Sequence, residues 1–325
     1  MKRLVISLTL LTIGLAIVLG SGTFAAKKNP VLGFSQLGAE SEWRVACTRS
    51  IQGSAKDYGF TLIFSDAQQK QQNQIAALRS FIARKVDAIG LTCVVESGWG
   101  PVLREIKAAN IPLIMIDRGS DEKDTSLWVT LIGSDFTEEG RKTAKWLGTY
   151  LAKKGIDDGK KEIKIDELQG TTGSAPALDR KKGFEEVMNA EHPNWKIVRS
   201  ETGNFTASEG KTVMQAFLKA DKDFQVLYAH NDQMALGAIQ AIKEAGMKPG
   251  KDMTIVSIDG VKGAFIAMMA GELNASIECN PLLGPQMYQA ALDTLAGKEL
   301  PKYIPTIEGV FDESNAAAAF PHRQY

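Results

Sequence analysis

Side chains suited to recognising hydroxyl groups collect at or beyond the ends of the β-strands that this sequence predicts. They are carboxylates, arginines, an amide, a hydroxyl and two aromatic rings: Glu40, Ser41, Trp43, Arg44, Asp117, Arg118, Arg180, Phe205, Asn231, Asp259 and Glu278. A hydroxyl group both donates and accepts hydrogen bonds, so carboxylates and amides serve as acceptors and arginine supplies a fixed fork of donors. Aromatic faces suit the C–H side of a ring. The set predicts a site for a small polyhydroxylated molecule.

Several of these residue types also have a purely structural interpretation. Ser41 and Asp232 can each cap the helix that follows, because both residue types are favoured at that position. Arg118 can form a local ion pair with its neighbour, and Trp43 and Phe205 can be core aromatics. The functional interpretation rests on recurrence at strand ends, since ligands of open parallel sheets bind beyond the carboxyl ends of the strands.

A catalytic role has little support in the sequence. Of His192, His230 and His322, only His230 is placed to act as a base, and the sequence contains no GxSxG, HExxH or GxxxxGK[ST] motif. Asp259 and Glu278 could form the carboxylate pair of a secreted glycosidase, but they equally suit hydroxyl recognition. We therefore expect a protein that is not an enzyme.

The three cysteines give no sign of a metal site. Cys47, Cys93 and Cys279 show neither CxxC nor Cys/His spacing. We expect buried small hydrophobic side chains and no metal or cofactor, and whether two of the cysteines form a disulfide is left open.

The elements that must position these groups alternate between strands and amphipathic helices. The strand-like runs form two successive series, at 31–34, 60–64, 88–91, 113–116 and 129–132, then 163–167, 197–201, 226–229, 254–258 and 275–278. Helical patterns fill the gaps, as at 72–84, where apolar residues recur every three or four positions. Two βαβ series predict two Rossmann-like α/β lobes with parallel sheets.

Length and composition agree with two lobes and a small ligand. The chain has 325 residues, 44% of them hydrophobic. A chain of this length is longer than one compact core usually holds. No flexible linker separates the two series, so several ordered crossings should join the lobes as a hinge. Basic and acidic residues both number 38, and no polybasic run occurs, so we expect no nucleic acid or membrane surface as a partner.

The N-terminus has the order of a cleaved signal peptide. Lys2 and Arg3 precede an apolar run over 4–19, and small residues follow up to Ala26. The run is short for a bilayer span, so we expect cleavage after residue 25 and a periplasmic location.

Six segments resemble the ribose/galactose-type periplasmic sugar-binding proteins of ABC transporters, and within that family the galactofuranose-binding members. They are GFSQLGAESEWR, SDAQQKQQNQIAALRSFI, PLIMIDRGS, DELQGTTGSAPALDRKKGF, YAHNDQMALGAIQAIKEAG and VSIDGVKGAF. The resemblance runs from about 31 to about 305 in the family's order. It implies the type I periplasmic binding protein fold, with a three-crossing hinge near 134–135, 278–279 and 306. The N-terminal lobe would hold 26–134 and 279–306, and the C-terminal lobe 135–278 and 307–325.

The resemblance also implies roles for single residues. Asp117 and Arg118 match the pair that grips sugar hydroxyls from the first lobe, and Trp43 with its neighbours matches an aromatic, polar loop. The implied second-lobe contacts are Arg180, Phe205, Asn231, Asp259 and Glu278. The implied function is delivery of a galactofuranose-like monosaccharide to an ABC permease by a monomeric protein.

Three features depart from the family's pattern. Cys93 stands where several relatives have proline, Glu42 replaces a small residue, and the Ala-rich tail 311–325 is unlike the family's. Of these, we expect Glu42 to alter the pocket. Another pentose, a polyol or an autoinducer is the alternative ligand. A sugar-sensing repressor core is a further alternative, but such proteins carry a helix-turn-helix ahead of the core and this chain has an export signal.

Overall fold

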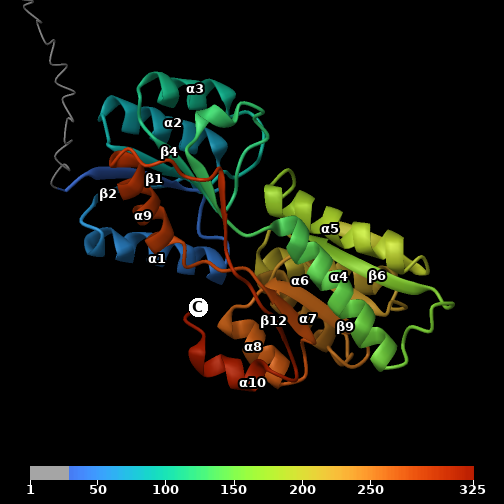
Figure 1. Ribbon diagram of the computed structural model, residues 1–325. Helices are drawn as coiled ribbons and strands as arrows, with labels where there is room; N and C mark the ends of the chain where they lie inside the picture. Colours follow the sequence, from blue (N-terminus) through green and yellow to red (C-terminus); the bar gives the residue numbers. More distant parts are fainter. Residues whose placement is uncertain (1–28) are drawn as a thin grey trace, which may run out of the picture.

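The computed structural model describes residues 29–325, so the expected signal peptide lies outside the described residues. Two six-stranded sheets organise the chain (Figure 1). The first has the order β11-β5-β4-β3-β1-β2 and the second β12-β10-β9-β8-β6-β7. All pairings are parallel except that of β12 with β10. The two parallel-sheet lobes predicted from the sequence are confirmed, with one antiparallel edge strand that the sequence did not indicate.

The first lobe combines residues that precede most of the second lobe in the sequence with residues that follow it. Its strands are β1 (Val31–Gln36), β2 (Thr61–Asp66), β3 (Ala88–Leu91), β4 (Leu113–Ile116), β5 (Thr130–Gly133) and β11 (Tyr303–Pro305). Its helices are α1 (Glu42–Asp57), α2 (Gln71–Ala83), α3 (Gly100–Ala108) and α9 (Gly284–Leu295). Helix α1 packs against α9, and α2 packs against α3 on the opposite face of the sheet (Figure 1).

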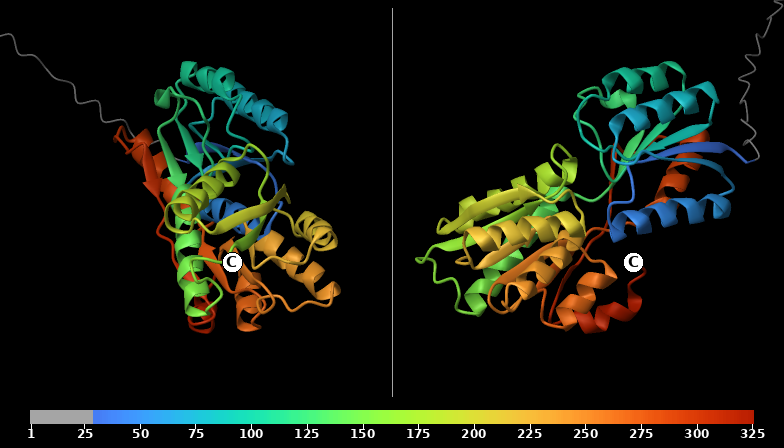
Figure 2. Two further views of the ribbon diagram at one scale, coloured as in Figure 1. Left: turned by 90° about the vertical axis from the view of Figure 1, so that its right-hand side faces the viewer. Right: turned by 180° about the vertical axis from the view of Figure 1, so that it is seen from behind.

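The second lobe repeats this plan. Its strands are β6 (Ile163–Gln169), β7 (Trp195–Thr202), β8 (Val226–Ala229), β9 (Thr254–Asp259), β10 (Ala275–Glu278) and β12 (Val310–Asp312). Its helices are α4 (Phe136–Lys153), α5 (Ala175–Glu191), α6 (Ala207–Ala220), α7 (Asp232–Glu244), α8 (Lys262–Met269) and α10 (Ala316–Ala319). Short 3-10 turns lie at Thr125–Leu127 in the first lobe and at Phe320–His322 in the second. The right view in Figure 2 shows the two lobes as separate bodies.

The apolar periodicity of the sequence places the helices on the sheets. In α2, Leu78 and Phe81 are buried, as the three-and-four spacing predicts. The Phe81 ring lies directly over β1, where a Cβ atom at Gly33 would come within 2.5 Å of it. Glycine at that position therefore lets a large ring cover the sheet.

Three chain segments connect the lobes. They run from β5 to α4, from β10 to α9 and from β11 to β12. Ser134 Oγ contacts Cys279 Sγ at 3.2 Å, so the first two crossings touch. Glu308 of the third accepts hydrogen bonds from Ser134 Oγ, Asn280 N and Thr306 Oγ1. One carboxylate thus gathers all three crossings. Within residues 29–325, no helix has the length and apolarity to cross a membrane.

Candidate functional site

A pocket of about 270 Å³, partly open to solvent, lies between the lobes. It is lined by Glu40, Ser41, Trp43, Arg44, Asp117, Arg118, Phe136, Pro176, Arg180, Phe205, Asn231, Asp259 and Cys279. Every side chain that the sequence singled out, except Glu278, is therefore brought to one place.

The first-lobe wall is a buried network of four charged side chains. Arg44 Nε lies 3.1 Å from Glu40 Oε1, and Arg44 Nη2 lies 2.6 Å from Asp117 Oδ2. Arg118 is more loosely paired, at 3.6 Å from Asp117 and 3.7 Å from Glu40. Burial and the neighbouring Arg44 lower the pKa of Arg118 to about 10, which still leaves it protonated at neutral pH. The wall combines two cations with two anions.

Some donors in this network lack an acceptor. Among the residues that the structure describes, Arg118 Nε, Arg118 Nη1 and Arg44 Nη1 are buried without a hydrogen-bond partner. Buried polar groups nearly always have partners, so unpartnered guanidinium groups at a pocket point to a ligand that accepts hydrogen bonds. These atoms are the strongest sign that the pocket binds something.

Two residues of the pocket wall also cap helices. Ser41 Oγ accepts a hydrogen bond from Arg44 N at the start of α1, at 3.1 Å. Asn231 Oδ1 accepts one from Met234 N at the start of α7, at 3.0 Å. The capping interpretation is correct for Ser41 but wrong for Asp232, whose carboxylate is instead buried. Its pKa is raised to about 6 by that burial, against the opposing hydrogen bonds of nearby donors.

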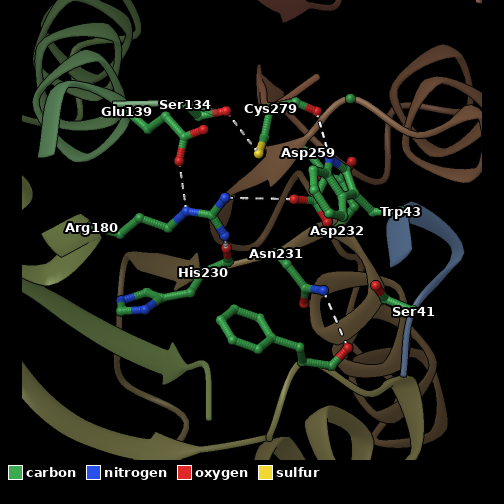
Figure 3. A network of polar contacts seen from close by, with 12 residues as sticks. Ser41, Trp43, Ser134, Glu139, Arg180, His230, Asn231, Asp232, Asp259 and Cys279 are labelled. Atoms are coloured by element: carbon green, nitrogen blue, oxygen red, sulfur yellow. Dashed lines mark hydrogen bonds and ion pairs between the residues drawn. The ribbon is translucent and has the colours of Figure 1, made fainter. Parts of the chain in front are cut away.

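The second-lobe wall centres on one arginine (Figure 3). Arg180 donates from Nε to Glu139 Oε2 at 2.7 Å and from Nη1 to the His230 carbonyl oxygen at 2.5 Å. Its Nη2 lies 3.7 Å from Asp259 Oδ1. Burial opposes the charge on Arg180, but the nearby anions outweigh it and raise the pKa above its usual range. A fixed cation therefore faces the pocket from α5.

The two walls meet through aromatic contacts. The Arg118 guanidinium lies 5.0 Å from the centroid of the Phe205 ring, across the pocket. Trp43 Nε1 donates to the Cys279 carbonyl oxygen at 2.6 Å, as Figure 3 shows. The rings of Trp43 and Phe205 are both buried, and both also line the pocket. Each residue is therefore a core aromatic and a pocket residue at once. Directly beyond the pocket, Glu96 N donates to Gly173 O at 3.0 Å and joins the lobes again.

Three residues of the wall have a backbone that L-residues rarely adopt. Asp117, Phe205 and Asp259 have φ angles of 63°, 62° and 135°. Such conformations persist where the surrounding structure enforces them, and they concentrate at functional sites. The Phe205 carbonyl oxygen, for example, accepts a hydrogen bond from Asn231 Nδ2 at 3.2 Å.

The structure contradicts two expectations from the sequence. Glu278 does not line the pocket, because its carboxylate binds Arg323, Tyr325 and the amide of Gly309. Glu42 is exposed and lines a different cavity, between α1 and the C-terminus, so the expectation that it alters the pocket is wrong.

Sequence reasoning missed three lining residues. Phe136 and Pro176 lie in the first turns of α4 and α5, and Cys279 follows β10. Nothing in the type of an apolar residue marks it as a pocket residue. The position of Cys279 directly after a strand was the one available signal. All three cysteines are buried and free, so the structure contains no disulfide among them.

The remaining titratable groups nearby have structural partners. His230, the one candidate base, is fully buried, and its Nε2 lies 3.1 Å from Glu167 Oε1. Burial lowers the pKa of His230. Glu139, Cys279 and Glu308 form a group in which a metal could lie, with ligand atoms within 4.8 Å of one another. Since Glu139 binds Arg180 and Glu308 joins the crossings, we interpret this group as part of the hinge.

Comparisons with known proteins agree with this fold. A family model described as "Periplasmic binding protein domain" matches residues 32–299. The galactofuranose-binding protein YtfQ of Escherichia coli (strain K12) is 51% identical over 259 residues, which cover 78% of this chain and 79% of the relative.

Two solved structures have the same fold and related sequences. One is the periplasmic binding protein component of the arabinose ABC transporter from Shewanella sp. ANA-3, bound to α- and β-L-arabinofuranose. It has a TM-score of 0.85 at 49% identity, covering 90% of this chain and 95% of that one. The other, from Mycobacterium smegmatis in complex with β-D-fucofuranose, has a TM-score of 0.87 at 46% identity, covering 91% and 95%. The chain thus belongs to the periplasmic binding protein domain family.

Proposed function

We propose that this chain is an extracytoplasmic solute-binding protein that holds one monosaccharide in the interlobe pocket and delivers it to an ABC permease. The observation that carries the proposal is the set of buried, unpartnered guanidinium donors on Arg44 and Arg118. The Arg118 guanidinium also faces an aromatic ring from the other lobe. Sugar hydroxyls supply the acceptors that these donors lack. The ring of Phe205 offers a face for the C–H side of the sugar.

The sugar we propose is a furanose of the galactofuranose type. The relatives described above are named for galactofuranose or are bound to arabinofuranose and fucofuranose. The residues proposed to contact it are those lining the pocket, with Arg180, Asn231 and Asp259 acting from the second lobe. Glu278 is proposed to act only indirectly.

The mechanism we propose is closure driven by differential contact. The lobes, assigned as 26–134 with 279–306 and 135–278 with 307–325, turn about the three crossings. A sugar that touches both walls stabilises the closed arrangement, because the open one offers the contacts of a single wall. The protein would act as a periplasmic monomer after removal of residues 1–25, and the closed rim would present a matched surface to the permease.

We further propose that the protein has no catalytic activity. Asp259 is paired with Arg180, and His230 is paired with Glu167 outside the pocket lining. Neither arrangement offers a free general base beside a bound sugar.

Calorimetric titration of the mature protein tests the proposal. The panel contains galactofuranose, galactopyranose, arabinose, ribose and glucose, with thermal unfolding followed in parallel. A ligand at 100 times its dissociation constant stabilises a protein by about 2.7 kcal/mol, so a true ligand registers in both measurements. We expect one-to-one binding of a furanose form. Binding of none of these sugars, or turnover of any of them, would refute the proposal.

A further inference from the structure

The C-terminal tail packs against the second lobe through several specific contacts. The family model ends at residue 299, whereas the chain continues through β12 and α10 to Tyr325. The end of the tail lies beside α8, on the side of the second lobe that faces α1 (Figure 1). Tyr325 is buried, with 7% of its surface exposed, so the last residue is packed rather than free.

Arg323 is the centre of these contacts. Its Nε and Nη2 donate to the carbonyl oxygen of Gly260 at 3.1 Å and 2.7 Å. Its Nη1 donates to Glu278 Oε1 at 2.5 Å, and Tyr325 hydroxyl donates to the same oxygen at 3.0 Å. The guanidinium also lies 5.1 Å from the centroid of the Phe265 ring. A planar fork with this many partners is held in one orientation.

The carbonyl that Arg323 grips belongs to the residue after Asp259, a pocket residue. Asp259 has a φ of 135° and Gly260 a φ of 75°, so the chain turns sharply where the carboxylate enters the pocket. The other groups of this turn are also held, since Gly260 N donates to Ser276 Oγ and Asp259 O accepts from Cys279 N. Within residues 29–325, the Asp259 carboxylate forms one ion pair, with Arg180 at 3.7 Å. Its direction is therefore set by its backbone.

We propose that Arg323 is a positioning residue for sugar binding, which holds the turn at Asp259–Gly260 and so fixes where the Asp259 carboxylate meets the ligand. This inference rests on the proposed function. It also explains the position of Glu278, which anchors the tail instead of contacting the sugar.

The experiment compares Arg323→Gln with a matched control, Arg199→Gln. Arg199 lies in the same lobe and has the same kinds of partner: both Asp166 carboxylate oxygens at 2.7 Å, two backbone carbonyls and aromatic rings. It is not among the pocket residues. Both variants should unfold at lower temperature than the wild type, but only Arg323→Gln should weaken sugar binding, by about tenfold.

Two further variants test whether the effect passes through Asp259. In an Asp259→Asn background, Arg323→Gln should cause little additional loss of affinity, because the carboxylate that it positions is absent. Arg323→Lys should bind sugar more tightly than Arg323→Gln but more weakly than the wild type. One ammonium group can hold Gly260 or Glu278, but it cannot serve both. An equal loss of affinity with and without the Asp259 carboxylate would overturn the proposal.

A measurement without sugar separates this inference from the proposed function. Amide hydrogen exchange at Gly260 and Lys262 should be faster in Arg323→Gln than in Arg199→Gln, because Gly260 loses its anchor and Lys262 N donates to the Tyr325 carbonyl oxygen. Unchanged exchange at both amides would show that Arg323 does not hold the Asp259–Gly260 turn, whatever the protein binds. A wild type that binds no sugar would refute the proposed function. The exchange result would still decide whether Arg323 holds the Asp259–Gly260 turn.

Discussion

The two walls of the pocket are built in different ways. The first-lobe wall comes from two short stretches, 40–44 and 117–118, whose charges pair with one another. The second-lobe wall draws its residues from α4, α5, β9 and the segments after β7 and β8, and has one arginine at its centre. Cys279 lines the pocket from the crossing that follows β10. In the first wall, each anion has two cations within reach. In the second wall, a single cation, Arg180, binds Glu139, Asp259 and a backbone carbonyl oxygen.

Because of this difference, the two walls should respond unequally to loss of a charge. A shared network retains partial pairing when one member is removed. A single cation leaves all of its partners uncompensated, and an unpaired buried charge is strongly destabilising.

The largest effect is expected for Arg180→Ala compared with Arg118→Ala. Loss of Arg180 removes the cation that Glu139 binds at 2.7 Å, and removing one partner of a buried pair costs about 3–5 kcal/mol of stability. Uptake of a proton by Glu139, which burial favours by raising its pKa to about 8, offsets part of this cost. Loss of Arg118 leaves Glu40 and Asp117 paired with Arg44, so its cost should be smaller. Urea unfolding measures both stabilities, and calorimetry should show weaker sugar binding in each variant. Equal losses of stability would remove the proposed contrast between the walls.

Acid should act on the second lobe through Glu167. Burial alone would raise the pKa of this carboxyl, but hydrogen bonds from His230 and Lys181 outweigh it and lower the pKa to about 2. The ionised form is therefore favoured in the folded protein. The resulting stability, on the order of 3 kcal/mol, is present above the unfolded-state pKa near 4.5 and is lost as the pH falls from there to about 2.

The variant Glu167→Gln tests this linkage. It should be less stable than the wild type at neutral pH, but the difference should shrink as the pH falls through that window. Unfolding free energies measured by urea titration between pH 7 and pH 2 check the expectation, with exposed Glu299→Gln as the control. A constant gap between Glu167→Gln and the wild type across that range would contradict it.

The aromatic part of the second wall depends on a glycine. A Cβ atom at Gly170 would lie 1.8 Å from Cζ of Phe205, so Gly170→Ala must displace the ring that faces Arg118. Overpacking of this kind costs about 1–3 kcal/mol, and we expect weaker sugar binding as well. Gly53→Ala in α1 is the control, because nothing lies within 4 Å of its added Cβ. That change should stabilise the helix by about 0.5–1 kcal/mol and leave binding unchanged. Wild-type affinity in Gly170→Ala would show that the ring makes no contact with the sugar.

The sequence was a good guide to the fold and to the polar part of the site. Strand runs and helix periodicity are local patterns, and parallel strands place their carboxyl ends at one edge, so residues such as Asp117 and Asn231 could be assigned to the cleft. Sequence could not say which side chain points inward at the end of a strand. At β9 the last residue, Asp259, faces the pocket, whereas at β10 it is the following residue, Cys279.

Long-range contacts set the rest. Glu278 was assigned to the sugar because of its strand end and its resemblance to the family, but Arg323, which is distant in sequence, binds its carboxylate. Phe136 and Pro176 line the pocket through helix starts, where apolar side chains carry no sign of a ligand. Neither effect leaves a local pattern, because both depend on how distant segments meet.

The smallest expected effects come from the two helix caps in the walls. Ser41→Ala removes one capping bond at the start of α1 and should cost about 1 kcal/mol. Asn231→Ala removes the cap of α7 and also the amide bond to the Phe205 carbonyl oxygen, which adds about 1 kcal/mol. Asn231→Ser retains a capping oxygen and loses only the second bond, so its cost should fall below that of Asn231→Ala.

Urea unfolding of the three cap variants measures these differences, and Ser41→Thr is the control that retains a capping hydroxyl. The comparison isolates a difference between the walls, since the first-lobe cap stabilises only its helix, whereas the second-lobe cap also holds the backbone of the aromatic residue. Affinity should therefore fall further in Asn231→Ser than stability alone would suggest, because Phe205, with its φ of 62°, loses a bond that keeps its ring facing the pocket. If Asn231→Ser and Ser41→Thr bind sugar equally well, the amide of Asn231 neither positions the ring nor contacts the ligand.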